Sequence, residues 1–205
     1  MLESNSMKKI ISYLLSNPIL FNSVRRTIAG NQENTKNFVR SNLQIYKAKK
    51  VLDVGCGTGE FSDALPEDFD YTGVDINIKY ITFAQKNYKN AKRKFLIQDI
   101  TDRHFFENQR YEATLLISML HHLSDAELEK ILPIIKRVTT KIVIVADIIP
   151  DPQGLLRKLM VKMDQGKFVR SREDKIKILC KYFKIIRTAI IPSRLAVQFG
   201  IVCKV

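Results

Sequence analysis

The 205-residue chain contains no tryptophan and only three cysteines. An odd number of cysteines without framework spacing excludes a disulfide-stapled fold and favours reduced thiols, as in the cytoplasm. No Cys/His cluster has the spacing of a zinc site, so we expect no metal. No apolar run reaches the ~18–20 residues of a membrane span, and the short run after Lys9 lacks the cleavage site of a signal peptide.

Acidic residues are also scarce, since 21 Asp and Glu face 34 Lys and Arg, for a net charge of +13. Residues 151–205 carry 13 basic and 4 acidic side chains, which gives +9 in this part alone. A basic face can attract nucleic acid, anionic lipid or a phosphorylated small molecule. The alternative is a lysine-rich surface that serves solubility. Basic charge without a base-reading motif does not favour nucleic acid as the partner.

Residues 51–60 organise the chain and read Val-Leu-Asp-Val-Gly-Cys-Gly-Thr-Gly-Glu. An apolar run breaks into glycines at alternate positions and then enters a polar segment, which predicts a strand, a tight turn and a helix. Gly55, Gly57 and Gly59 lack Cβ atoms, so the backbone can take positive φ and a ligand can lie directly against it. The turn therefore predicts a ligand site.

The turn differs from the dinucleotide fingerprint Gly-x-Gly-x-x-Gly, whose third glycine would fall at Glu60. That fingerprint places a pyrophosphate on a helix N-terminus, and a carboxylate there would repel it. Asp53 also suits a cationic ligand better than a diphosphate. The arrangement Asp53-x-Gly55-x-Gly57-x-Gly59 resembles the first motif of class I S-adenosylmethionine-dependent methyltransferases. We therefore expect S-adenosylmethionine as the cofactor rather than NAD.

Two later aspartates extend this site. Asp75 lies 22 residues beyond Asp53, near the ~20-residue interval at which an acidic strand end binds ribose hydroxyls. The alternative is an N-cap for a helix over residues 77–88. The resemblance implies that Asp99 binds the exocyclic amine of adenine, and a turn aspartate is the alternative. The expected cofactor-binding residues are Asp53, Gly55, Cys56, Gly57, Gly59, Asp75, Ile76, Asp99, Ile100 and Ser118.

Helical and strand patterns alternate along the chain. Residues 6–46 have helical spacing in two or three pieces, with Pro18 in a first turn and Gly30 at a stop. Strands are expected from residue 51 and at 71–75, 94–98, 113–117, 141–146, 185–190 and 195–202, and helices at 60–64, 77–88, after Ser124 and at 171–183.

This order predicts an α/β fold with a doubly wound, Rossmann-like, mostly parallel sheet and helices on both faces. The resemblance implies a seven-stranded sheet with an antiparallel ending. We expect a methyltransferase domain over residues 47–205 behind an N-terminal helical cap over residues 1–46.

The loop after the fourth expected strand reads Ser118-Met119-Leu120-His121-His122-Leu123. Methyl transfer to a hydroxyl or an acidic carbon benefits from a base, and histidine has a suitable pKa. His121 and His122 are the catalytic candidates, and only one of them is expected to point inward. Asp147 is a further candidate, for acceptor binding or for holding a histidine. The alternative is that both histidines are structural.

Two motifs that the sequence lacks narrow the class of acceptor molecule. The loop lacks the Asn/Asp-Pro-Pro-aromatic motif of methyltransferases that act on exocyclic amines of nucleic acids, and no cysteine is placed as a nucleophile for C5 chemistry. The resemblance is closest to enzymes that modify quinones and natural products. We predict methyl transfer to a small-molecule acceptor, first of all at oxygen, by a monomer or homodimer. The alternatives are an RNA ribose methyltransferase, motivated by the basic tail, and a non-catalytic cofactor-binding subunit.

Overall fold

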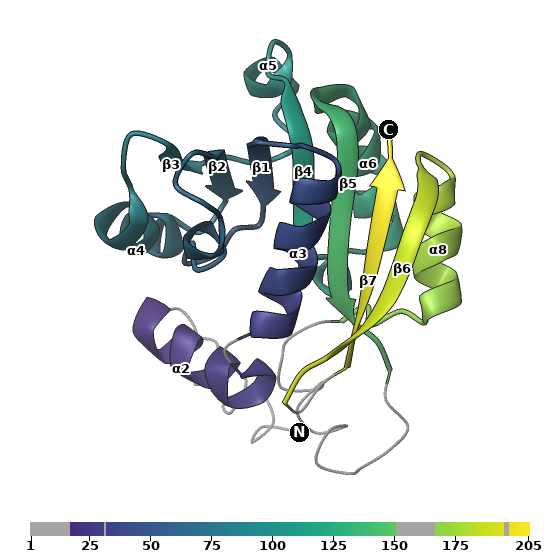
Figure 1. The fold of residues 1–205 in the computed structure, drawn as a ribbon, viewed down its shortest axis with the longest axis horizontal. Coiled ribbons are helices and arrows are strands. Elements are labelled where there is room, and N and C mark those ends of the chain that lie inside the picture. The colour runs from purple at the N-terminus through teal and green to yellow at the C-terminus, as the bar shows by residue number, and fades with distance from the viewer. Residues whose placement is uncertain (1–16, 31, 151–166, 195–196) are drawn as a thin grey trace, which may run out of the picture.

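Seven strands form one sheet in the order β3-β2-β1-β4-β5-β7-β6 in the computed structural model, which describes residues 17–30, 32–150, 167–194 and 197–205 (Figure 1). The first five strands are parallel, and β7 runs antiparallel to both of its neighbours. The strands are β1 Lys50–Val54, β2 Asp70–Asp75, β3 Arg93–Ile97, β4 Tyr111–Ile117, β5 Thr139–Ile148, β6 Lys184–Pro192 and β7 Val197–Lys204. The predicted seven-stranded, doubly wound fold is confirmed.

The helices begin where short polar side chains cap them. Asn17 caps α2, Asn77 caps α4, and Ser124 forms with Glu127 the predicted capping box of α6. The α-helices are α2 Pro18–Ala29, α3 Glu33–Ile45, α4 Ile78–Tyr88, α5 Arg103–Phe106, α6 Asp125–Val138 and α8 Arg172–Cys180, with 3-10 turns η1 Ser62–Ala64 and η2 Leu120–His122.

The sheet is buried on both faces, so its central strands are apolar throughout. Along β5, Ile142, Ile144 and Ala146 join one core cluster, while Val143 and Val145 join the other. The first cluster includes side chains of α3 and α4 and the two residues that flank η1, and the second includes those of α6 and α8. Figure 1 shows α3 in front of the sheet, with α6 and α8 behind it. The expected helices on both faces are therefore confirmed.

The segment after the glycine turn is shorter than predicted. Instead of a helix over residues 60–64, the chain forms the single 3-10 turn η1, in which backbone amides donate hydrogen bonds to carbonyls three residues earlier. Pro66 explains the stop, because it forces the preceding Leu65 into the extended conformation that it adopts (φ −94°, ψ 144°).

Pro18 lies in the first turn of α2 and Gly30 follows its last residue, as predicted. The start of the expected N-terminal helical region, residues 6–16, and residues 151–166 of the basic segment after β5 lie outside the described residues.

In the part of the chain that the structure describes, no helix is both long and apolar enough to cross a membrane. The same residues contain no group of three or more His, Cys, Asp or Glu side chains suited to a metal ion. The proposed division at residue 46 stays a prediction.

The packing of α3 on the sheet depends on a glycine. A Cβ atom at Gly200 of β7 would lie 2.8 Å from Cε1 and Cζ of Phe38, which α3 buries there, and 2.8 Å from Cδ1 of Ile191. We expect Gly200→Ala to lower the free energy of unfolding by about 1–3 kcal/mol, because the ring and the strand must shift to admit the methyl group. Urea denaturation measures this loss.

Thr188→Ala is the matched control. Thr188 is exposed on β6 and pairs with Ile201 of β7, so its truncation should change stability by only about 0.5 kcal/mol. Equal losses for the two variants would contradict close packing of α3 against β7.

Candidate donor and acceptor site

The glycine turn leaves β1 with positive φ at all three predicted glycines, which are Gly55 (71°), Gly57 (54°) and Gly59 (82°). They serve different purposes. A Cβ atom at Gly59 would lie 2.7 Å from Cε1 of Phe95, so this glycine lets the turn pack on β3. Gly55 is exposed, and a Cβ atom there would meet only the Met119 side chain, at 3.4 Å. A ligand can therefore approach the backbone at Gly55.

Cys56 points away from this open side. Its thiol packs beside β2, where a Cβ atom at Gly73 would lie 2.8 Å from the sulfur. Burial raises the pKa of Cys56 well above its usual value, so the side chain stays a thiol. Only the backbone of Cys56 is placed for a ligand.

The carboxylate of Asp75 holds the turn to the end of β2. Its Oδ2 accepts the Gly57 amide (2.9 Å) and its Oδ1 accepts the Asn77 amide (2.8 Å). The N-cap alternative for Asp75 is wrong, because Asn77 caps α4. Burial raises the pKa of Asp75, and these backbone bonds oppose the rise. Each carboxylate oxygen keeps a second lone pair for a ligand. Ile76 follows with 74% of its surface exposed.

Asp53 lies behind the turn rather than in it. The side chain is 2% exposed and its Oδ2 accepts the Tyr71 hydroxyl at 2.6 Å. Burial raises the pKa of Asp53 to about 7, with the nearby Asp75 adding to the rise while the Tyr71 bond opposes it. Asp53 is therefore too deeply buried for direct contact with a ligand at the turn.

Asp99 and Ile100 follow β3 and differ in exposure. Asp99 is exposed, and its Oδ1 accepts both the amide and the hydroxyl of Thr101 at 2.8 Å. This is the geometry of the turn-aspartate alternative, and it leaves Oδ2 for a ligand. Ile100 is 7% exposed and belongs to the core cluster behind the sheet.

Helix α2 lies across the glycine turn. The buried Asn22 accepts the Thr58 hydroxyl at 2.6 Å, and the rings of Phe21 and Tyr80 lie 4.8 Å apart. Helix α2 also supplies two arginines to Glu60, through an ion pair with Arg25 and one with Arg26 at 2.9 Å. The charge of Glu60 is therefore paired with two arginines of α2, which the sequence argument about a pyrophosphate did not include.

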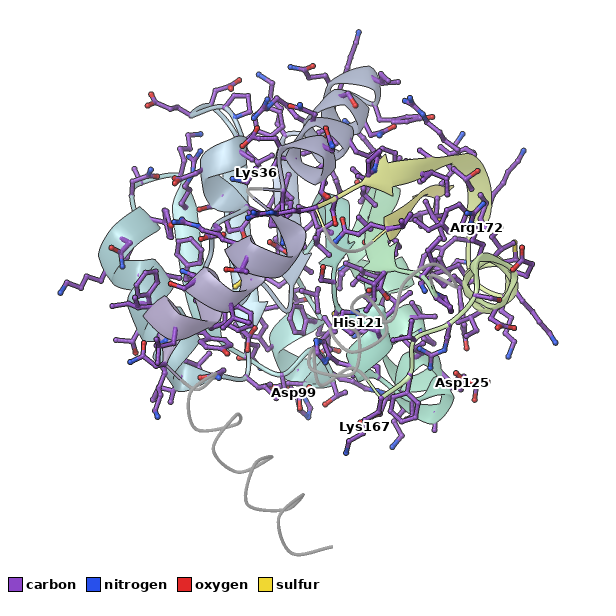
Figure 2. The ribbon with its side chains drawn as sticks, turned by 90° about the horizontal axis from the view of Figure 1, so that it is seen from below. Lys36, Asp99, His121, Asp125, Lys167 and Arg172 are labelled. Carbon is purple, nitrogen blue, oxygen red and sulfur yellow. The ribbon has the colours of Figure 1, made fainter. Side chains whose placement is uncertain are left out.

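The loop after β4 brings the catalytic candidates together. Nδ1 of His121 lies 2.5 Å from Oδ1 of Asp147, and the two side chains are 1% and 0% exposed. Asp147 is part of β5 rather than following it, and its Oδ1 also accepts the Ile148 amide at 3.0 Å. His122 is exposed, with its ring centroid 4.0 Å from that of His121. His121 is therefore the histidine that points inward. Figure 2, which looks onto the carboxyl ends of the parallel strands, shows it away from the rim.

Sequence reasoning missed the side chains that hold this loop. The guanidinium of Arg170 donates to the carbonyls of Leu120 (2.8 Å) and Leu123 (2.7 Å) and to the Asp125 carboxylate (2.6 Å). The amide of Phe168 donates to the His121 carbonyl at 3.0 Å. The only signal in the sequence is the basic character of this segment, which does not distinguish one arginine from another.

Lys175 is a second buried basic side chain that holds this region. Its ammonium group donates to the carbonyls of Ile148 (2.7 Å) and Arg170 (2.6 Å), and the residue is 1% exposed. Burial lowers the pKa of Lys175, and the nearby Asp147 opposes the change. The end of β5 and the start of α8 are therefore joined next to the His121–Asp147 pair.

Comparison with known proteins gives consistent results. Residues 51–141 match the family described as "Methyltransferase domain". Over 83 residues the chain is 34% identical to phosphoethanolamine N-methyltransferase 1 of Arabidopsis thaliana, covering 38% of this chain and 17% of the relative. Over 92 residues it is 30% identical to the ubiquinone biosynthesis O-methyltransferase of Aliivibrio fischeri, covering 43% and 39%. The chain thus spans less than half the length of these curated relatives.

The fold is similar to that of solved methyltransferases. Magnesium protoporphyrin IX methyltransferase from Synechocystis, solved with bound SAH, has a TM-score of 0.65 at 21% identity over 85% of this chain and 83% of its own. A SAM-dependent methyltransferase from Archaeoglobus fulgidus has a TM-score of 0.66 at 18% identity, over 90% and 99%. These structures have the same fold as this chain, and the domain match over residues 51–141 falls within it.

The buried Asp53 makes stability depend on pH. Its folded-state pKa of about 7 is raised from 3.8, so the folded protein keeps a proton that the unfolded chain loses. Between these values stability should fall as pH rises, by at most about 1.4 kcal/mol per pH unit. Asp53→Asn mimics the protonated form and should remove this fall. Denaturant titrations from pH 4 to pH 8 measure the difference between variant and parent.

The exposed Asp63 of η1 provides the control. Asp63→Asn should leave the pH profile of the parent unchanged. Parallel profiles for Asp53→Asn and the parent would show that Asp53 is ionised in the folded protein throughout this range.

Proposed function

We propose that this chain is a class I S-adenosylmethionine-dependent methyltransferase and that it methylates an oxygen atom of a small-molecule acceptor, with His121 as the general base. The observation that carries the proposal is the contact between Nδ1 of His121 and Asp147 at the carboxyl ends of β4 and β5. In an α/β sheet this edge, beside the point where the strand order reverses, is where ligands bind. Here the order reverses between β1 and β4, which carry the glycine turn and the histidine loop.

The residues at the turn fit the donor. The open backbone at Gly55 admits a ligand, and Asp75 presents a carboxylate that can accept two hydroxyl groups of a ribose. Ile76 offers an exposed apolar surface beside it, and Oδ2 of Asp99 can accept from an adenine amine. When bound, S-adenosylmethionine supplies a methyl group activated by its sulfonium. In this proposal Gly55, Cys56, Gly57 and Gly59 receive the methionine part through their backbone, with Asp53 behind them and Ser118 opposite, while Ile100 packs beneath.

Asp147 prepares His121 for its role. A carboxylate that accepts the Nδ1 proton fixes the tautomer in which Nε2 is basic, and it stabilises the imidazolium that forms. The acceptor hydroxyl gives its proton to His121 as its oxygen bonds to the methyl carbon, and the carbon–sulfur bond breaks. In this proposal the exposed His122, whose ring lies 4.0 Å from that of His121, contacts the acceptor.

The donor site is tested by Asp75→Ala. We expect the affinity for S-adenosylhomocysteine to fall about 10- to 100-fold, because two charge-assisted hydrogen bonds to the ribose are lost. Isothermal titration calorimetry measures the change, and circular dichroism checks that the variant is folded. Asp70→Ala removes an exposed carboxylate from the start of the same strand and should leave the affinity unchanged. An unchanged affinity in Asp75→Ala would show that Asp75 is not part of the donor site. Tighter binding of NAD than of S-adenosylhomocysteine by the unmodified protein would overturn the assignment of S-adenosylmethionine as the cofactor.

The base is tested with an acceptor found by screening hydroxylated small molecules for methyl incorporation. We expect His121→Ala and Asp147→Asn to lower kcat by about 10²- to 10⁴-fold, as is usual for loss of a general base and its partner. His122→Ala should lower kcat by less than about tenfold and should act mainly on KM.

Affinity for S-adenosylhomocysteine should stay unchanged in all three variants, which separates chemistry from donor binding. Full rates in both histidine variants would make the histidines structural. Methyl incorporation into RNA but into none of the small molecules would favour the ribose methyltransferase instead. Activity only in the presence of a partner protein would favour the non-catalytic subunit.

A further inference from the structure

A buried amide connects three distant segments beside the donor turn. Oε1 of Gln198 on β7 accepts the hydroxyl of Thr35 on α3 at 2.5 Å, and Nε2 donates to Oγ of Ser118 at 3.2 Å. Gln198 is 2% exposed and Thr35 is 1% exposed. Because the Thr35 hydroxyl donates to the oxygen end of the amide, the nitrogen end faces Ser118. In this orientation the side-chain amide of Gln198 donates to Ser118.

Ser118 occupies an unusual place. It follows the last residue of β4 with a φ of 52°, a left-handed conformation that a residue with a Cβ atom adopts only where its surroundings impose it. Its amide donates to the Ala146 carbonyl of β5 at 2.8 Å. The side chain of the next residue, Met119, would lie 3.4 Å from a Cβ atom at Gly55. Ser118 is therefore held at the boundary between the donor turn and the histidine loop.

The side-chain amide of Gln198 determines which hydrogen bonds the Ser118 hydroxyl can still form. A hydroxyl group has one hydrogen to donate and two lone pairs to accept with. The bond from Gln198 occupies one lone pair, and among the described residues this is the only hydrogen bond of the Ser118 side chain. The hydroxyl hydrogen is therefore available to a ligand at the turn.

We propose that Gln198 is a positioning residue that makes Ser118 a hydrogen-bond donor to the methionyl carboxylate of the bound methyl donor. This inference rests on the proposed function. Within the amino-acid part of the donor the carboxylate accepts hydrogen bonds and cannot donate them, so it matches a hydroxyl whose lone pair is already engaged. Thr35 donates to the oxygen end of this amide, which connects the donor site to α3.

Two ligands separate this contact from general damage. S-adenosylhomocysteine carries the amino-acid part, and 5′-methylthioadenosine lacks it while keeping the nucleoside. We expect Ser118→Ala to weaken S-adenosylhomocysteine about tenfold, as for one hydrogen bond to a charged group, and to change methylthioadenosine less than about twofold. Gln198→Met, which keeps the length of the side chain without its polar atoms, should weaken S-adenosylhomocysteine about 3- to 10-fold with the same selectivity. Calorimetry measures both ligands.

The double variant Ser118→Ala/Gln198→Met should bind S-adenosylhomocysteine no more weakly than Ser118→Ala alone, because Gln198 acts only through the hydroxyl. Thr114→Val is the matched control. It removes a buried hydroxyl from β4, where Thr114 pairs with Thr139 at 2.6 Å, and it should leave both affinities unchanged.

The possible outcomes are distinct. Wild-type affinity for S-adenosylhomocysteine in Gln198→Met, or additive losses in the double variant, would overturn the positioning role. Equal weakening of both ligands in Ser118→Ala would overturn the contact with the carboxylate. Failure of the unmodified protein to bind S-adenosylhomocysteine at all would instead overturn the proposed function.

Discussion

The carboxylate of Asp75 is the contact on which the glycine turn, the proposed donor site, depends. By accepting the amides of Gly57 and Asn77, it fixes the glycine turn to the end of β2 and places the start of α4. Two neutral backbone donors on one carboxylate make charge-assisted bonds, which are stronger than those between neutral groups. These bonds also oppose the rise in pKa that burial causes. The charge that can bind a ribose is thus the charge that shapes the turn.

Glu60 shows why the charge of a site cannot be read from one side chain. In the sequence it appears as a carboxylate where a dinucleotide fingerprint has glycine, but α2 brings Arg25 and Arg26 to it from more than thirty positions away. The local charge is therefore set by a helix that sequence reasoning treated as a separate cap. The same helix buries Asn22 against Thr58, so the turn is shaped from both sides.

The sequence was sufficient wherever a local pattern determined the structure. The apolar runs and capping residues predicted the succession of strands along the chain and the start of α6, because these depend on neighbouring residues in the sequence. The length of η1 was predicted poorly, since the effect of Pro66 on Leu65 competes with a polar, helix-like composition. The orientation of His121 and the burial of Asp53 were not predictable, because each depends on one partner from another strand, Asp147 and Tyr71. Arg170 and Gln198 were missed for the same reason.

The two halves of the site differ in how the chain builds them. The residues proposed for the donor, from Asp53 to Asp99, lie within the part that matches the methyltransferase domain, residues 51–141. The proposed acceptor side uses Asp147 and Arg170, which come later in the chain and contact His121 or the loop after β4. Similarity to other methyltransferases over the first part therefore supports the donor and leaves the acceptor undetermined. We propose that the acceptor is selected where β5 and residues 167–171 meet the histidine loop, because Asp147 and Arg170 contact that loop there.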